Sequence, residues 1–125
     1  SIIFVCDNHE IDDAEFEIFP VHCVKGTDET EIIEELRGYS DEIIYKHRYS
    51  AFFDTCLERR LVQTAPSKLI ICGVCTDICV LHTVADARNR DYPVEVRSDA
   101  VASFDIEAHE NALIHMRKIL GANVI

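Results

Sequence analysis

Cationic side chains are scarce in this sequence. Its 125 residues include 12 Lys and Arg against 23 Asp and Glu, a formal net charge of -11 at pH 7. A phosphate backbone or an anionic membrane surface would be repelled by this charge rather than neutralised. We therefore expect no nucleic-acid partner and no membrane partner. Much of the negative charge falls in residues 10–17 and 28–35, which we interpret as a solvated acidic face.

Long apolar runs are also missing, and none could span a bilayer. The 48% hydrophobic content provides apolar material for one modest core, so we predict a single domain over residues 1–125. Six cysteines could indicate disulfides. However, Cys6, Cys56 and Cys72 lie in apolar strand or helix patterns, where free thiols behave as small hydrophobic residues. A reducing, cytoplasmic setting is the expectation.

Short apolar segments alternate with helical patterns along the chain. The predicted strands cover residues 1–6, 42–46, 69–72, 93–96 and 122–125, with 99–103 as a short extension or turn. The predicted helices run from a capping box at Asp28 through Leu36, from about Thr55 through Val62, from Cys79 to Arg90 and over 106–120. This alternation predicts an α/β fold of three layers, α/β/α, with a Rossmann-like parallel sheet covered by helices on both faces.

The stretch over residues 68–80 contains a candidate nucleophile. A buried strand from Leu69 is interrupted at Gly73, and helical spacing begins near Cys79. Free N–H groups and the helix dipole at such a turn favour a thiolate over a thiol. Lys46 ends another strand; alone it would be an ordinary solvated charge, but beside Cys79 it would lower the thiol pKa and relay a proton.

A second group of polar residues follows the first strand. Asp7 and His9 stand at its carboxyl end, where open parallel sheets place ligand-binding groups, and the alternation of an extended chain puts both on one side. With His22 they suit a borderline metal such as zinc, with Glu15 or water completing the shell. The alternative is that these are unrelated surface residues.

The cysteines allow two further interpretations. Cys72 and Cys75 have the spacing of a redox pair, and Cys72, Cys75 and Cys79 could form a zinc knuckle. Cys72 is expected inside a strand and directed away from the turn, which disfavours both.

Several motifs, in order, resemble those of the isochorismatase-like cysteine hydrolases, and within that superfamily the chain is similar to the nicotinamidases. The nucleophile motif is matched by residues 73–80 (GVCTDICV). The other matches are Asp7-Asn8-His9, Phe19-Pro20-Val21-His22 with Gly26-Thr27, the Lys-x-x-Tyr-Ser-Ala-Phe motif at residues 46–52, and the tail segments 99–103 and 109–113.

This resemblance implies a metal-dependent amidohydrolase that converts nicotinamide to nicotinate and ammonia, and that also acts on pyrazinamide. Cys79 would attack the amide to form a thioester, with Lys46 as the second catalytic residue. The backbone N–H groups of Cys75 and Cys79 would form the oxyanion hole, next to a cis peptide between Val74 and Cys75.

The resemblance also implies one divalent metal, Zn²⁺ with Mn²⁺ or Fe²⁺ as alternatives. Its expected ligands are Asp7, His9, Glu15 and His22. The expected substrate-binding residues are Phe19, Tyr49 and Val74. The partner would be a small amide, and a homo-oligomer is possible because the helix face around Leu81 could form either a subunit contact or part of the core.

One element of the family pattern has no counterpart. The family's catalytic Asp ends a strand that precedes the strand beginning here at Ser1. We therefore expect residues 1–125 to be a partial chain that lacks the first strand and helix and, alone, most of the turnover. Two alternatives stay open: a related hydrolase for another small amide or carbamoyl compound, and an inactive metal-binding relative.

Overall fold

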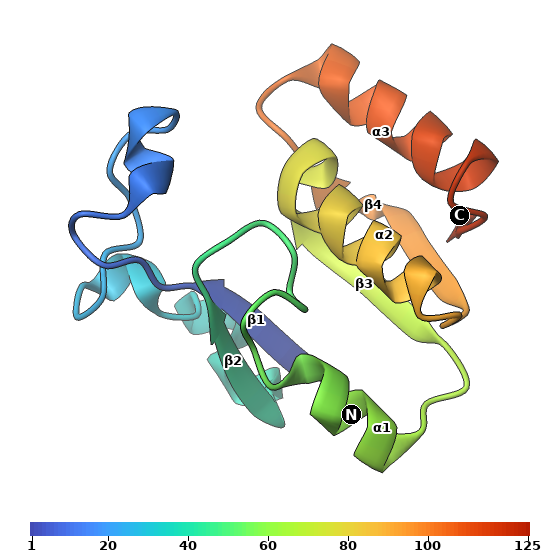
Figure 1. Ribbon diagram of the computed structural model, residues 1–125, viewed down its shortest axis with the longest axis horizontal. Coiled ribbons are helices and arrows are strands. Elements are labelled where there is room, and N and C mark those ends of the chain that lie inside the picture. The colour runs from blue at the N-terminus through green and yellow to red at the C-terminus, as the bar shows by residue number, and fades with distance from the viewer.

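Parallel strands and helices alternate in a computed structural model that describes all residues from 1 to 125 (Figure 1). The strands are β1 (Ile3–Asp7), β2 (Glu42–Lys46), β3 (Leu69–Val74), β4 (Val94–Ala102) and β5 (Asn123–Val124). The α-helices are α1 (Leu57–Thr64), α2 (Leu81–Asn89) and α3 (Ile106–Lys118). Every strand pair is parallel, which confirms the predicted α/β class. None of the helices combines the length and the apolar character needed to cross a membrane.

The strands form two sheets. One contains β1 and β2, and the other has the order β3-β4-β5. No strand ladder joins β1 to β3, but the carboxyl ends of the two sheets meet, because Lys46 at the end of β2 donates a hydrogen bond to Cys79 just beyond β3. Functional groups from both sheets therefore converge at one edge, as the parallel topology requires.

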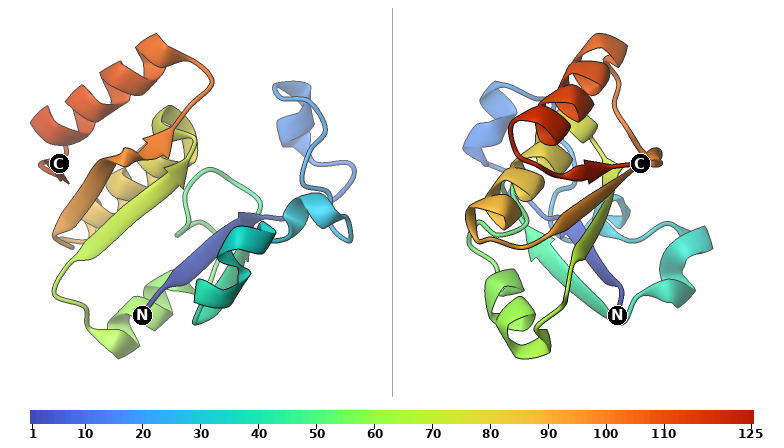
Figure 2. Two further views of the ribbon diagram at one scale, coloured as in Figure 1. Left: turned by 180° about the vertical axis from the view of Figure 1, so that it is seen from behind. Right: turned by 90° about the vertical axis from the view of Figure 1, so that its right-hand side faces the viewer.

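One apolar core joins the three α-helices to the strands. Its most enclosed members are Val84 and Ala87 of α2, Val96 of β4 and Met116 of α3, all fully buried. The helical spacing that predicted an inward face on α2 is thereby confirmed. In Figure 2 a short 3₁₀ helix, η3 (Glu34–Tyr39), lies on the opposite side of β1 from α1, so both faces of the β1-β2 sheet carry helical segments.

Strand β3 differs from the prediction in two respects. It was expected to be buried, yet Ile70 is 58% exposed, Val74 is 68% exposed and Cys72 is also exposed. The helices α1, α2 and α3 share one core, and nothing in residues 1–125 covers the other face of this strand. The strand also continues through Gly73, which has φ +119° and accompanies a shift of register in the pairing with β4.

The predicted helix from Asp28 through Leu36 is wrong. This segment forms two short 3₁₀ helices, η2 (Asp28–Thr30) and η3, separated by extended backbone, and Thr27 makes no side-chain cap. The Glu29 carboxylate accepts a hydrogen bond from the backbone N–H of Cys23 at 2.8 Å. Its acidic side chain thus fastens a loop instead of capping an α-helix.

Two other element boundaries differ from the predicted ones. Residues 93–96 and 99–103 were predicted as separate pieces but belong mostly to one strand, β4. The last helix ends at Lys118, near Gly121, whose φ of +66° is typical of a residue that terminates a helix.

Candidate active site

Asp7, His9 and His22 lie together at the carboxyl end of β1. Their potential ligand atoms are all within 4.8 Å of one another. The reason is local: His9 forms a short parallel bridge with Val24, in which its N–H donates to Cys23 and its carbonyl accepts from Lys25. This bridge holds the loop that contains His22 against the end of the strand. The three cysteines of the alternative zinc knuckle form no such group.

Glu15 lies next to this cluster, beside its two histidines. It lies on the 3₁₀ helix η1 (Ala14–Glu17), is 8% exposed, and places Oε2 at 3.3 Å from His9 Nε2 and 3.7 Å from His22 Nε2. Two buried side-chain atoms have no hydrogen-bond partner: His9 Nε2 and Glu15 Oε1. Buried polar atoms without partners are costly, and histidine and glutamate are residue types that commonly ligate divalent metals. The donor set of two imidazoles and two carboxylates therefore fits a metal such as zinc.

Asp13 and Arg48 form a second layer around the cluster. Asp13 Oδ2 accepts from His9 Nδ1 at 3.0 Å, and both carboxylate oxygens accept from Arg48 Nη1, at 2.7 and 2.9 Å. Burial opposes ionisation of Asp13, but the hydrogen bonds from the Glu15 N–H, His9 and Arg48 lower its pKa to about 2. The prediction of a solvated acidic face over residues 10–17 is therefore wrong for Asp13 and Glu15, which are buried in this loop.

Cys79 lies in a π-helical turn, η4 (Thr76–Val80), between β3 and α2. Two hydrogen bonds anchor the turn: Thr76 Oγ1 to His109 Nδ1 at 2.8 Å, and Ser103 Oγ to Asp77 Oδ1 at 2.5 Å. The peptide bond between Val74 and Cys75 is cis, as the resemblance implied. The turn therefore begins three residues before Cys79, earlier than the helical spacing alone indicated.

Lys46 lies between Cys79 and the Asp7-His9-His22 cluster. Its Nζ donates to Cys79 Sγ at 3.3 Å and to the carbonyl of Arg48 at 2.9 Å, and it forms an ion pair with the Asp7 carboxylate. Burial lowers the pKa of the Lys46 ammonium, but Asp7 and Cys79 together raise it above its ordinary value. The cation therefore persists although its side chain is only 6% exposed. The sequence placed Asp7 in the metal cluster alone; in the structure it is also the acid beside Lys46.

The expectation that Cys79 favours a thiolate is not supported. Burial raises the pKa of the Cys79 thiol, and the Lys46 ammonium lowers it by less. The sequence identified the cation and the turn correctly but gave no measure of desolvation. Near neutral pH the raised pKa therefore favours the thiol form of Cys79 beside the Lys46 ammonium.

The raised pKa of the Cys79 thiol affects its reaction with alkylating reagents. The thiolate is the form that reacts, so a raised pKa means that iodoacetamide should modify Cys79 slowly near neutral pH and faster as the pH rises past the ordinary thiol range. Mass spectrometry of each labelled cysteine across an alkaline pH series measures this, with exposed Cys72 as internal reference. If alkylation of Cys79 reached its full rate at a lower pH than alkylation of Cys72, the raised pKa of the Cys79 thiol would be contradicted.

A cavity of about 310 Å³ lies between Cys79 and the metal cluster. Its walls include the expected substrate-binding residues Phe19, Tyr49 and Val74, together with Asp7, Glu15, Pro20, His22, Cys75, Ile78, Cys79 and Phe104. The rings of Phe19 and Tyr49 meet edge to face at 6.3 Å. Phe104, which is 77% exposed at this cavity, was not predicted, because its short loop carries no recognisable motif.

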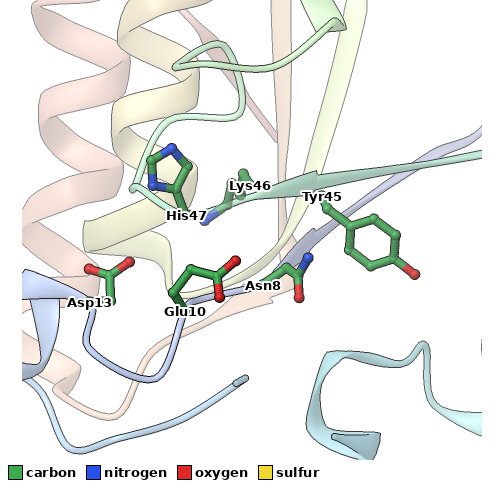
Figure 3. A pocket seen from close by; sticks show the side chains of 6 residues that line it. All are labelled: Asn8, Glu10, Asp13, Tyr45, Lys46 and His47. Atoms are coloured by element: carbon green, nitrogen blue, oxygen red, sulfur yellow. The ribbon is translucent and has the colours of Figure 1, made fainter. Parts of the chain in front are cut away.

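A second cavity, of about 300 Å³, lies near the carboxyl ends of β1 and β2 (Figure 3). It is lined by Asn8, Glu10, Asp13, Tyr45, Lys46 and His47. Only one of these side chains is apolar in character, so this cavity suits water better than an aromatic ring. Lys46 lines this cavity and also bonds to Cys79, which lines the first, so the two cavities are adjacent.

Residues 1–125 match the family described as the isochorismatase domain. The structure is similar to the nicotinamidase/pyrazinamidase PncA from Bacillus subtilis, with a TM-score of 0.88 and 38% identity, covering 98% of this chain and 73% of that one. It is also similar to a pyrazinamidase from Pyrococcus horikoshii in complex with zinc (TM-score 0.90, 29% identity, 98% and 73% covered). N-carbamoylsarcosine amidase from Thermoplasma acidophilum is a third relative (TM-score 0.88, 36% identity, 98% and 69% covered).

Proposed function

We propose that this chain, which belongs to the isochorismatase family of hydrolases, is a metal-dependent cysteine amidohydrolase. It converts nicotinamide to nicotinate and ammonia, and it also accepts pyrazinamide. One observation supports this most directly: a single small cavity has a lysine-bonded cysteine on one side and a metal-binding group on the other. Its volume is at the lower end of the range of about 300–1,000 Å³ for small-molecule sites, which suits a one-ring amide.

The reaction begins at Cys79. As the Lys46 ammonium passes one of its protons to a carboxylate, Asp7 in this chain, the Lys46 nitrogen takes up the thiol proton of Cys79. The sulfur attacks the amide carbonyl carbon, and Lys46 then gives a proton to the departing nitrogen and recovers one from the carboxylate. The C–N bond breaks, ammonia leaves and a thioester remains. Water then attacks the thioester, which releases the carboxylic acid and restores the thiol.

The tetrahedral intermediate needs donors for its oxygen anion. We assign this role to the backbone N–H groups of Cys75, which precedes the η4 turn, and Cys79, which lies within it. The anchoring of this turn by Thr76 and Asp77 keeps the donors fixed, so little reorganisation is needed when charge develops.

The ring of the substrate would lie between Phe19, Tyr49 and Val74. Asp7, His9, Glu15 and His22 would hold the metal, which we assign as zinc, with Mn²⁺ or Fe²⁺ as alternatives. A metal held there would act as a Lewis acid toward the ring nitrogen of the substrate. The aromatic walls then orient the amide toward Cys79.

The Asp7 carboxylate would have to serve both as a metal ligand and as the partner of Lys46. No strand ladder joins β1 to β3, and one face of β3, with Ile70 and Val74, is exposed. We propose that a further strand completes the sheet here and brings the acid of the family's triad to Lys46, leaving Asp7 to the metal. A single domain in three layers would then enclose the site.

The competing function is hydrolysis of a carbamoyl compound, supported by the likeness to N-carbamoylsarcosine amidase. The apolar and aromatic walls of the cavity favour the ring of nicotinamide over a short, polar carbamoyl acid. An inactive metal-binding relative is a third possibility, and the raised pKa of the Cys79 thiol is the feature that favours it.

Ammonia release tests these alternatives. With zinc supplied, we expect release from nicotinamide and pyrazinamide, and little from N-carbamoylsarcosine. Treatment with a chelator should abolish the release, and added Zn²⁺ should restore it, because the ring would lose its anchor at the metal cluster. Turnover that persists without metal, or that is confined to the carbamoyl compound, would contradict the nicotinamidase assignment.

A further inference from the structure

The Asp13 carboxylate accepts four hydrogen bonds from protein groups. Its side chain is 5% exposed, and each oxygen accepts two hydrogen bonds. Oδ1 accepts from the Glu15 N–H at 2.8 Å and from Arg48 at 2.7 Å, and Oδ2 accepts from His9 Nδ1 at 3.0 Å and from Arg48 at 2.9 Å. One carboxylate thus ties together two neighbours in its own loop and a residue that follows β2.

The two loop neighbours are those with unsatisfied atoms. His9 Nε2 and Glu15 Oε1 are the two buried side-chain atoms without a partner, and Asp13 bonds to both residues through other atoms. An acceptor-only carboxylate requires His9 Nδ1 to be the donor. An imidazole that carries its proton on Nδ1 has its free lone pair on Nε2, the atom that lies 3.3 Å from Glu15 Oε2.

We propose that Asp13, held by Arg48, is a positioning residue of the metal site: it sets the tautomer of His9 and the direction of Glu15 so that both present a lone pair to one divalent ion. This inference rests on the metal site of the proposed function. Asp13 touches neither the substrate cavity's aromatic walls nor Cys79, so its effect is exerted through the two ligands.

Arg48 extends the same network to the nucleophile. Its guanidinium holds Asp13, and its carbonyl accepts the Lys46 Nζ bond at 2.9 Å. Arg48 follows Lys46 by two residues, so one short segment fixes both the lysine beside Cys79 and the acid behind His9. The metal cluster and the nucleophile are therefore held at a constant separation.

Asp13→Asn tests the proposal. An amide has one acceptor oxygen and one donor nitrogen, so it cannot accept from His9, Arg48 and the Glu15 N–H together. We expect affinity for Zn²⁺, measured by competition with a chromophoric chelator, to fall about 10- to 100-fold. Asp12→Asn is the matched control, because Asp12 is the exposed neighbour and should leave the affinity unchanged. Loading with Co²⁺ should also show an altered visible absorption spectrum for Asp13→Asn alone.

Arg48→Gln provides a second variant that leaves the Asp13 carboxylate in place. It should weaken Zn²⁺ binding in the same direction, and it decides the question if Asp13→Asn fails to fold by circular dichroism. Folded variants that bind Zn²⁺ as tightly as the unaltered chain would overturn the proposal. A protein that includes the further strand proposed above, and that binds Zn²⁺ but releases no ammonia from nicotinamide, would overturn the substrate assignment instead, so the two failures are distinguishable.

Discussion

Replacing Cys79 with alanine is expected to lower ammonia release from nicotinamide by a factor on the order of 10⁴ or more. The Cys79 sulfur lines the small cavity and accepts a hydrogen bond from Lys46 at 3.3 Å. Without it, only binding and the oxyanion donors remain to accelerate hydrolysis by water. The loss should appear in kcat, while KM changes little, because the aromatic walls and the metal cluster are untouched.

Two other cysteines provide matched controls for this substitution. Cys72→Ala alters an exposed side chain outside the cavity and should leave turnover unchanged. Cys75→Ala removes a thiol that does line the cavity but retains the backbone N–H assigned to the oxyanion hole. A Cys79→Ala variant that keeps its activity, combined with an inactive Cys75→Ala, would assign the nucleophile to Cys75 and refute the proposed mechanism.

The elements closest to the active site were predictable because they rest on local patterns. The short apolar runs that became β1, β2 and β3 are bounded by polar residues, and parallel topology brings their carboxyl ends to one edge. Alternation after β1 placed Asp7 and His9 on one side, and His22 joins them in the structure. The strand-turn-helix position of Cys79 likewise follows from spacing alone.

What could not be predicted depends on contacts between distant segments. Asp13 and Arg48 are 35 positions apart, and no local spacing marks their pairing. The pKa of Cys79 depends on how much protein surrounds its sulfur, a property of packing rather than of the GVCTDICV motif. The exposed face of β3 is a property of neighbours too, because its apolar sequence is typical of a buried strand.

Lys46→Met should reduce turnover of nicotinamide by about 10²- to 10⁴-fold. Methionine retains much of the side-chain length but removes the ammonium that donates to Cys79 and pairs with Asp7. The remaining Asp7 carboxylate disfavours a nearby thiolate, so the pKa of Cys79 should rise further and its alkylation near neutral pH should become slower. Lys68→Met is the control, since Lys68 is half exposed and pairs with Glu95, away from the cavity residues.

Zinc affinity distinguishes the Lys46→Met variant from variants that alter the proposed metal site, such as Asp13→Asn. In the unaltered chain Lys46 pairs with Asp7, a proposed metal ligand, so replacing Lys46 would free that carboxylate for the metal. Lys46→Met should therefore bind Zn²⁺ at least as tightly as before while losing turnover, whereas Asp13→Asn should lose zinc affinity first. If Lys46→Met retained turnover and the alkylation profile of the unaltered chain, Lys46 would be a structural cation only. If it lost zinc as well, the nucleophile and the metal site would not be separable, and the assignment of Lys46 to proton relay would fail.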